Sequence, residues 1–173
     1  MNRIVLFQPE KPGNVGNIIR TCMALDSKLT IIGPLTFELS DKTLRRAEMD
    51  YAVGFPVERF DTIDEFLEAH HDEEGYFVTR YSEHVYCDFD LSHVEKNYFF
   101  MFGRESTGIP KDVLKKYYDK TMRIPMAINA RSLNLSNSVA IVLCEALRQQ
   151  GFYNLATTET IKGRDFLKNY PDK

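Results

Sequence analysis

Short apolar runs alternate with segments of helical periodicity along this chain, and that alternation constrains its fold more than any other feature. Six runs are predicted to be strands, at residues 3–7, 29–32, 57–60, 76–79, 98–102 and 121–124. Five further segments are predicted to be helices, at residues 14–25, 41–48, 62–70, 110–117 and 136–150. Several strands are apolar throughout rather than at every second residue. This pattern predicts one α/β domain with a mainly parallel sheet and helices on both faces.

The composition narrows the class of protein. With 173 residues, of which 43% are hydrophobic, the chain is long enough for one domain with a real core. A formal net charge of −3 argues against strong non-specific binding of nucleic acid but allows a local basic patch. Three widely spaced cysteines, and no apolar run as long as a signal peptide or membrane helix, predict a reduced cytoplasmic protein without a membrane partner.

The last long predicted helix contains consecutive apolar residues from Val139 to Cys144. Such a helix is apolar on every side, which predicts burial on every side. One sheet covers only one side, so we predict a homodimer in which a second copy covers the other, and we expect Val142→Glu to give monomers or insoluble protein. The alternative is a central helix covered by a long loop. We assign residues 1–155 to the domain and leave residues 156–173, with a short helix within 159–170, as a tail of unassigned role.

Three loops that follow predicted strands are candidates for a ligand site. The first leads into a helix at Asn14, a candidate N-cap. The second begins at Gly103, where a ligand could approach the backbone, and contains Glu105 as its only carboxylate. The third ends in small polar side chains at residues 131–138. In a parallel sheet these loops share the carboxyl edge, where ligands bind. Taken singly, Glu105 is typical of a solvated loop, and Arg20 of a surface ion pair.

The sequence lacks the patterns of several common sites. The four histidines are not at metal-ligand spacing, and no GxSxG, GxGxxG or Walker motif occurs. A site without a metal or a covalent nucleophile suits transfer of a group that a cosubstrate has already activated.

Three motifs follow one another in order. They are Asn14-x-Gly16-Asn17-Ile18-x-Arg20-Thr21, then Phe102-Gly103-x-Glu105-x-x-Gly108-Ile109-Pro110, then Ile124-Pro125-Met126 with Arg131-Ser132-Leu133-Asn134-Leu135-Ser136-Asn137-Ser138-Val139. Over residues 3–153 the chain resembles the SPOUT superfamily of RNA methyltransferases, and within it the minimal TrmL/YibK-type enzymes. The resemblance implies a SPOUT fold with a C-terminal deep trefoil knot and an obligate homodimer. It also implies S-adenosyl-L-methionine as cofactor, S-adenosyl-L-homocysteine as product, and no metal.

The activity implied by the resemblance is 2′-O-methylation of the wobble nucleotide 34, a cytidine or modified uridine, in tRNA such as the leucine isoacceptors. The implied cofactor contacts are Val78, Thr79, Gly103, Ile124, Met126, Ser132 and Leu133. The implied catalytic set is Arg20 with Asn14, Glu105, Ser132 and Asn134. Because a guanidinium stays protonated, we favour Arg20 as a cation that lowers the pKa of the 2′-hydroxyl or binds the adjacent phosphate, over Arg20 as a general base.

Local basic residues are expected to bind the anticodon stem-loop. They are Arg20, Lys42, Arg45, Arg46 and Arg104. Two other functions remain open at this point. One is a superfamily enzyme that acts on another tRNA position or on ribosomal RNA, and the other is a non-enzymatic RNA-binding protein on the same fold.

Overall fold

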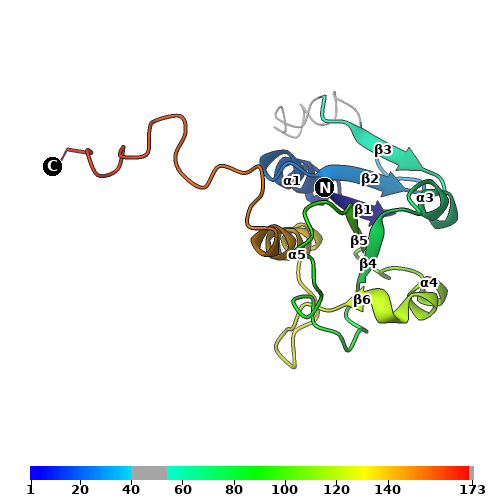
Figure 1. Ribbon diagram of the computed structural model, residues 1–173. Coiled ribbons are helices and arrows are strands. Elements are labelled where there is room, and N and C mark those ends of the chain that lie inside the picture. The colour runs from blue at the N-terminus through cyan, green and yellow to red at the C-terminus, as the bar shows by residue number, and fades with distance from the viewer. Residues whose placement is uncertain (40–53, 172–173) are drawn as a thin grey trace.

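The computed structural model describes residues 1–39 and 54–171, and its centre is one sheet in which every strand pair is parallel (Figure 1). The strand order is β3-β2-β1-β5-β4-β6. The strands are β1 Asn2–Phe7, β2 Lys28–Ile32, β3 Val57–Phe60, β4 Glu74–Val78, β5 Tyr98–Phe102 and β6 Thr121–Met122. The predicted α/β class and parallel sheet are therefore confirmed.

Helices cover both faces of the sheet, as predicted. The helices α1 Pro12–Ala24 and α5 Leu135–Gln149 lie on one face, whereas α3 Ile63–Ala69 and α4 Lys111–Lys116 lie on the other (Figure 1). A short 3-10 turn, Tyr118–Lys120, precedes β6. Within residues 1–39 and 54–171, no helix has both the length and the apolar character that a membrane crossing requires.

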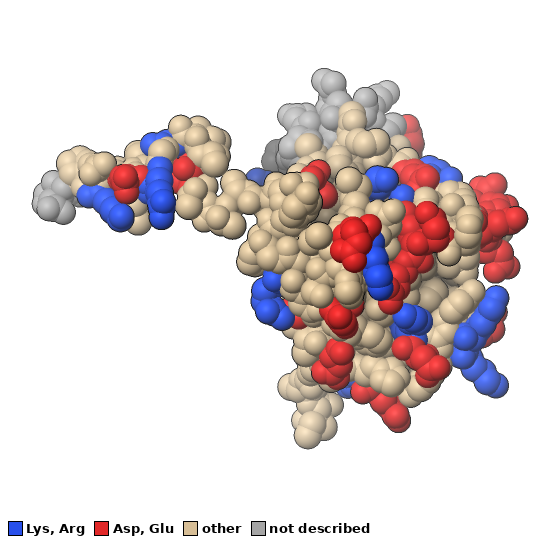
Figure 2. All heavy atoms as spheres, viewed as in Figure 1, with Lys and Arg blue, Asp and Glu red and all other residues tan. Residues whose placement is uncertain are grey.

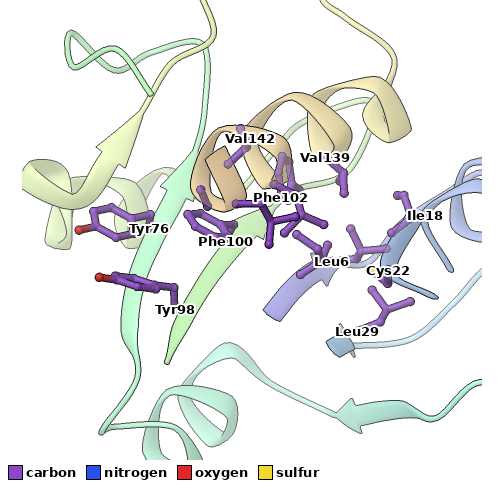
Figure 3. Close-up of a cluster of buried hydrophobic side chains, with 14 of the residues drawn as sticks. Leu6, Ile18, Cys22, Leu29, Tyr76, Tyr98, Phe100, Phe102, Val139 and Val142 are labelled. Atoms are coloured by element: carbon purple, nitrogen blue, oxygen red, sulfur yellow. The ribbon is translucent and has the colours of Figure 1, made fainter. Parts of the chain in front are cut away.

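The central strands are buried on both faces, which explains their continuous apolar sequence. In β1, Ile4 and Leu6 join the core beneath α1 and α5, whereas Val5 joins the smaller core beneath α3 and α4. Figure 3 shows the larger core, where Phe100 and Val142 meet between the sheet and α5. Burial of this much apolar surface is the main favourable term for a domain of this size.

Several predicted bounds differ from the structure. The helix α1 begins at Pro12, a residue that suits a first helical turn, so Asn14 lies inside the helix and is not its N-cap. The last strand ends at Met122 instead of residue 124, because Arg123 leaves β4 and pairs with Val85 in an isolated bridge. The helix predicted at residues 41–48 lies outside the described residues.

The long helix α5 is buried on one side in a single copy of the chain. Val139, Val142 and Leu143 are in the core, whereas Ile141 is half-buried and Cys144 is exposed. The sheet and α1 therefore cover one side only, as the sequence predicted. The side chain of Val142 packs against the chain's own core, so Val142→Glu tests the fold of a single copy and not the surface between copies.

The tail extends away from the folded body (Figure 1). Leu155 packs against the core, but residues 156–171 form turns and are exposed. The short helix predicted within residues 159–170 is therefore wrong. Hydrogen bonds in this segment are local, such as that from Phe166 N to Gly163 O, and Ile161 and Leu167 stay in solvent. Without a surface to bury its apolar side chains, so short a segment has little to stabilise a helix.

Candidate functional site

A cavity of about 610 Å³ opens at the carboxyl edge of the sheet, where the three motif loops meet. The last residue of β5 and the loop after it supply residues 102–109, and the segment before α5 together with its first residue supplies residues 131–135. The end of β4, the start of α1 and the segment after β6 also contribute, the last through Ile124 and Met126. The expected meeting of these loops is thus confirmed by the structure.

Most of the residues singled out in the sequence line this cavity. The seven positions expected to contact a cofactor are all in the lining: Val78, Thr79, Gly103, Ile124, Met126, Ser132 and Leu133. Of the five positions in the expected catalytic set, Asn14, Glu105, Ser132 and Asn134 are in the lining. Arg20 is not. It lies on α1, is exposed, and stands about 9 Å along the helix axis from Asn14.

A chain of side-chain hydrogen bonds joins the three loops. Asn134 Nδ2 donates to Asn14 Oδ1 at 2.9 Å, and Asn14 Nδ2 donates to Glu105 Oε1 at 2.8 Å. Glu105 also accepts from the backbone N–H groups of Glu10 at 2.8 Å and Lys11 at 3.3 Å. Its carboxylate therefore lies at the N-terminus of α1, where it satisfies free N–H groups and meets the positive end of the helix dipole.

Asn134 has a second role, because it is the N-cap of α5. Its Oδ1 accepts from the Ser136 backbone N–H at 2.8 Å and from the Ser136 hydroxyl at 2.6 Å. The polar stretch before α5 thus starts the helix and, through Asn134, ties that start to α1. This contact spans 120 residues of sequence.

The loop after β5 folds tightly against itself. Arg104 and Gly108 pair in an antiparallel bridge, and Gly108 has a φ of +76°, which glycine adopts without strain. A Cβ atom on Gly103 would lie 2.1 Å from the backbone of both Gly108 and Ile109. Gly103 was expected to admit a ligand to its backbone, but the group that approaches it is the chain's own loop.

A second pair of polar contacts holds this loop to the first one. Ser106 donates to the carboxylate of Glu10 from its backbone N–H at 2.8 Å and from its hydroxyl at 2.7 Å. These hydrogen bonds from Ser106 are the main reason that the pKa of Glu10 is lowered. Each of the two loops therefore supplies a carboxylate to the other: Glu105 accepts hydrogen bonds from the loop before α1, and Glu10 accepts them from the loop after β5.

The basic residues expected to bind RNA are distributed unevenly. Arg104 lines the cavity, and its Cζ atom lies 5.7 Å from the centroid of the Phe7 ring. Lys42, Arg45 and Arg46 lie outside the described residues. On the face in Figure 2, acidic and basic side chains are interspersed, in keeping with the small net charge.

The sequence analysis missed part of the cavity rim. Lys11, Arg80 and Tyr81 are in the lining but belong to none of the expected sets. Arg80 and Tyr81 follow directly after Val78 and Thr79, so their position beyond the carboxyl end of a strand could have indicated them. Among the described residues, no group of three or more His, Cys, Asp or Glu side chains could hold a metal ion.

Comparisons with known proteins point to one family. The model of the SpoU rRNA methylase family matches residues 1–144. A proposed tRNA (cytidine(34)-2′-O)-methyltransferase of Listeria monocytogenes is 49% identical over 151 residues, which are 87% of this chain and 89% of that protein. The tRNA (cytidine(34)-2′-O)-methyltransferase of Escherichia coli is 39% identical over 153 residues, which are 88% of this chain and 96% of that protein.

Solved structures agree with these relatives. A proposed RNA methyltransferase from Bacillus anthracis has a TM-score of 0.85 at 45% identity and covers 90% of this chain and 98% of its own. A structure described as giving insight into 2′-OH methylation of C/U34 on tRNA has a TM-score of 0.76 at 35% identity, over 88% of this chain and 97% of its own. An AdoMet-bound rRNA methyltransferase from Sinorhizobium meliloti has a TM-score of 0.72 at 29% identity, over 85% of this chain and 56% of its own. This chain belongs to the SpoU methylase family.

Proposed function

We propose that this protein transfers a methyl group from S-adenosyl-L-methionine to the ribose 2′-oxygen of nucleotide 34, a cytidine or modified uridine, in tRNA. The observation that carries the proposal is the cavity whose lining includes all seven residues expected to contact the donor. Relatives named for this reaction, 39% and 49% identical over most of their length, support the same chemistry and the same nucleotide.

The cavity suits the proposed donor in size and lining. Its volume of about 610 Å³ lies within the range of roughly 300–1,000 Å³ that is usual for small-molecule sites. Ile124, Met126 and Leu133 offer apolar side chains to an adenine ring, and Ser132 and the loop after Gly103 add polar groups. When bound, S-adenosyl-L-methionine supplies an activated methyl group, so the protein need only position the acceptor and help its hydroxyl lose a proton.

The side chains that hydrogen-bond between the loops would maintain the geometry of the site. Asn14, Glu105 and Asn134 hold the three loops at fixed separations, and small errors in the placement of reacting atoms are costly. We infer that they act mainly as positioning residues. Within residues 1–39 and 54–171, Ser132 makes no hydrogen bond of this kind, and it is exposed at the cavity, where it could contact either the donor or the ribose.

Arg20 is proposed to act on the RNA and not on the donor, because it lies outside the cavity lining. As a permanent cation it would lower the pKa of the 2′-hydroxyl or bind the adjacent phosphate. Arg20→Ala should then lower kcat/KM for tRNA by at least about 100-fold, the usual cost of losing one electrostatic group from a reaction, while the Kd for S-adenosyl-L-methionine stays unchanged. Arg164→Ala, in the exposed tail, is the matched control and should retain full activity.

We further propose that the RNA is held by Arg104 together with Lys42, Arg45 and Arg46, and that the enzyme works in the cytoplasm as a homodimer. The exposed outer side of α5 supports the dimer, since it leaves apolar groups such as Ile141 partly in water. A dimer would also join two basic regions around one anticodon stem-loop. The trefoil knot and the division at residue 155 remain predictions.

The deciding experiment incubates the protein and methyl-labelled S-adenosyl-L-methionine with unmodified tRNA transcripts and with tRNA from a strain that lacks the endogenous enzyme. Label on the ribose of nucleotide 34 is the expected result. Label at another nucleotide, or on ribosomal RNA alone, would replace the proposed substrate. Measurable donor binding without transfer to any RNA would favour a non-enzymatic RNA-binding protein and overturn the proposal.

A further inference from the structure

An exposed aromatic residue stands at the rim of the cavity beside two cations. Tyr81 lines the cavity, yet 55% of the residue is exposed. Lys111 Nζ lies 4.4 Å from the centroid of its ring, and Arg80 Cζ lies 5.1 Å from it. An aromatic side chain that is exposed to water at the mouth of a site, close to cations, is a feature of surfaces that bind single-stranded nucleic acid.

The fold holds this cluster in place from two loops. The Tyr81 backbone N–H donates to Thr79 Oγ1 at 3.3 Å, next to the end of β4. Lys111, at the start of α4, donates from Nζ to the carbonyl oxygens of Thr107 at 3.2 Å and Ile109 at 3.4 Å. The loop after β5 therefore fixes the ammonium group over the ring, while more than half of the residue stays exposed to solvent.

We propose that Tyr81 stacks on the base of the nucleotide whose ribose is methylated, with Arg80 and Lys111 contacting the phosphates beside it. The inference rests on the proposed function. If the ribose 2′-oxygen must enter the cavity, the attached base has to lie at its rim, where Tyr81 is found. Bases in single-stranded loops are commonly recognised by stacking on aromatic side chains, and nearby cations bind the backbone.

Stacking also suits a site that accepts two pyrimidines. An aromatic ring contacts the face of a base and does not read its hydrogen-bonding edge, so cytidine and uridine can be held alike. The chemistry of Tyr81 therefore fits the proposed acceptance of either cytidine or modified uridine at nucleotide 34.

The test compares Tyr81→Ala, Tyr81→Phe and wild-type protein in methyl transfer to an anticodon stem-loop. Loss of one base stack commonly weakens binding by about tenfold, so Tyr81→Ala should raise the KM for RNA by about that factor, and the Kd for S-adenosyl-L-methionine should not change. Tyr81→Phe should behave as wild type, because stacking requires the ring and not the hydroxyl. Tyr170→Ala, which removes a tyrosine of similar exposure from the tail, should leave both constants unchanged.

The outcomes separate the stacking proposal from the proposed function. Without transfer to nucleotide 34 by the wild-type protein, both fail. If wild-type protein transfers the methyl group and Tyr81→Ala has an unchanged KM for RNA, only the stacking proposal fails. A weaker Kd for S-adenosyl-L-methionine with an unchanged KM for RNA would place Tyr81 in the donor site and overturn it as well.

A binding measurement gives a readout that does not need turnover. A fluorescent cytidine analogue at nucleotide 34 should be quenched on binding to wild-type protein and to Tyr81→Phe, but not at saturation with Tyr81→Ala. For Arg80→Gln, the slope of log K against log salt should be shallower by roughly 0.7, the value for one phosphate contact on a single strand. An equal quench with Tyr81→Ala would show that the base stacks elsewhere.

Discussion

At the scale of single residues, Gly103 has little freedom to change, because the backbone packs where a side chain would begin. The backbone of Gly108 and Ile109 fills the space where a Cβ atom of residue 103 would lie, so Gly103→Ala would push the loop after β5 out of the cavity wall. We expect a loss of about 1–3 kcal/mol in the free energy of unfolding, as for other overpacked sites, and donor affinity at least tenfold weaker. Thermal unfolding and calorimetric titration with S-adenosyl-L-methionine measure the two effects.

Gly13→Ala is the control for this substitution. A Cβ on Gly13, which lies in the first turn of α1, would meet nothing within 4 Å. Alanine is the better helix former by about 0.5–1 kcal/mol, so this variant should be at least as stable as wild type and bind the donor equally well. If both glycine variants behave alike, crowding at Gly103 is not what shapes the loop.

The residue scale also shows how far sequence reasoning reaches. Motif positions identified Asn14, Glu105 and Asn134 as site residues, and all three line the cavity. Their mutual hydrogen bonds join positions 91 and 120 residues apart, which no local pattern encodes. Asn14 was interpreted as an N-cap because capping is a local rule, but α1 begins at Pro12 and places Asn14 inside the helix. Tyr81 was missed because it lies in none of the three motifs.

At the scale of elements, α5 has two faces that a sequence pattern cannot distinguish. Six consecutive apolar residues leave no polar stripe to mark the outer side. The structure buries Val142 against the sheet and leaves Ile141 half-buried. We therefore expect Val142→Glu to unfold the domain, because it buries an unpaired charge. Ile141→Glu should leave the fold intact and weaken the dimer, and circular dichroism with analytical ultracentrifugation separates the two results.

The start of β4 carries an ion cluster that makes stability depend on pH. Burial alone would raise the pKa of Glu74, but hydrogen bonds from Lys120, Tyr76 and Lys96 outweigh it and lower that pKa to about 2. Since the folded pKa is below the unfolded one, the carboxylate stabilises the fold above about pH 4.5, and this contribution is lost as the pH falls towards 2.

Glu74→Gln should accordingly cost about 1–2 kcal/mol of unfolding free energy at pH 7, the usual scale for a charged hydrogen-bonded group that is partly exposed. The gap from wild type should close as the pH approaches 2, and urea unfolding at a series of pH values measures it. Glu95→Gln removes a more exposed carboxylate and should change stability much less than Glu74→Gln does. A gap that is constant from pH 7 to pH 2 would contradict the assigned role of Glu74.

At the scale of the whole molecule, the sequence predicted the central sheet better than it predicted the C-terminal tail. Strands such as β1 and β5 are buried on both faces, so their continuous apolar sequences identified them as strands without any tertiary information. The structure of the tail could not be predicted in this way. Its apolar residues pack against no surface within the described chain, and the segment forms turns in place of the predicted helix. The membership of the SPOUT superfamily, expected from three motifs, is confirmed by the family match and the related structures.

The proposed dimer makes a prediction about thiol reactivity. Cys22 is buried, and burial raises the pKa of its thiol to about 12, so it should stay unreactive in the folded protein. Cys87 and Cys144 are exposed in a single copy, but Cys144 lies on α5 and should be covered in a dimer formed through that helix.

A thiol reagent should then label one cysteine rapidly in the native dimer, and none in Cys87→Ser. Dissociation by Ile141→Glu should add Cys144 to the reactive set. Two rapidly labelled cysteines in a wild-type sample that sediments as a dimer would mean that the copies meet at another surface.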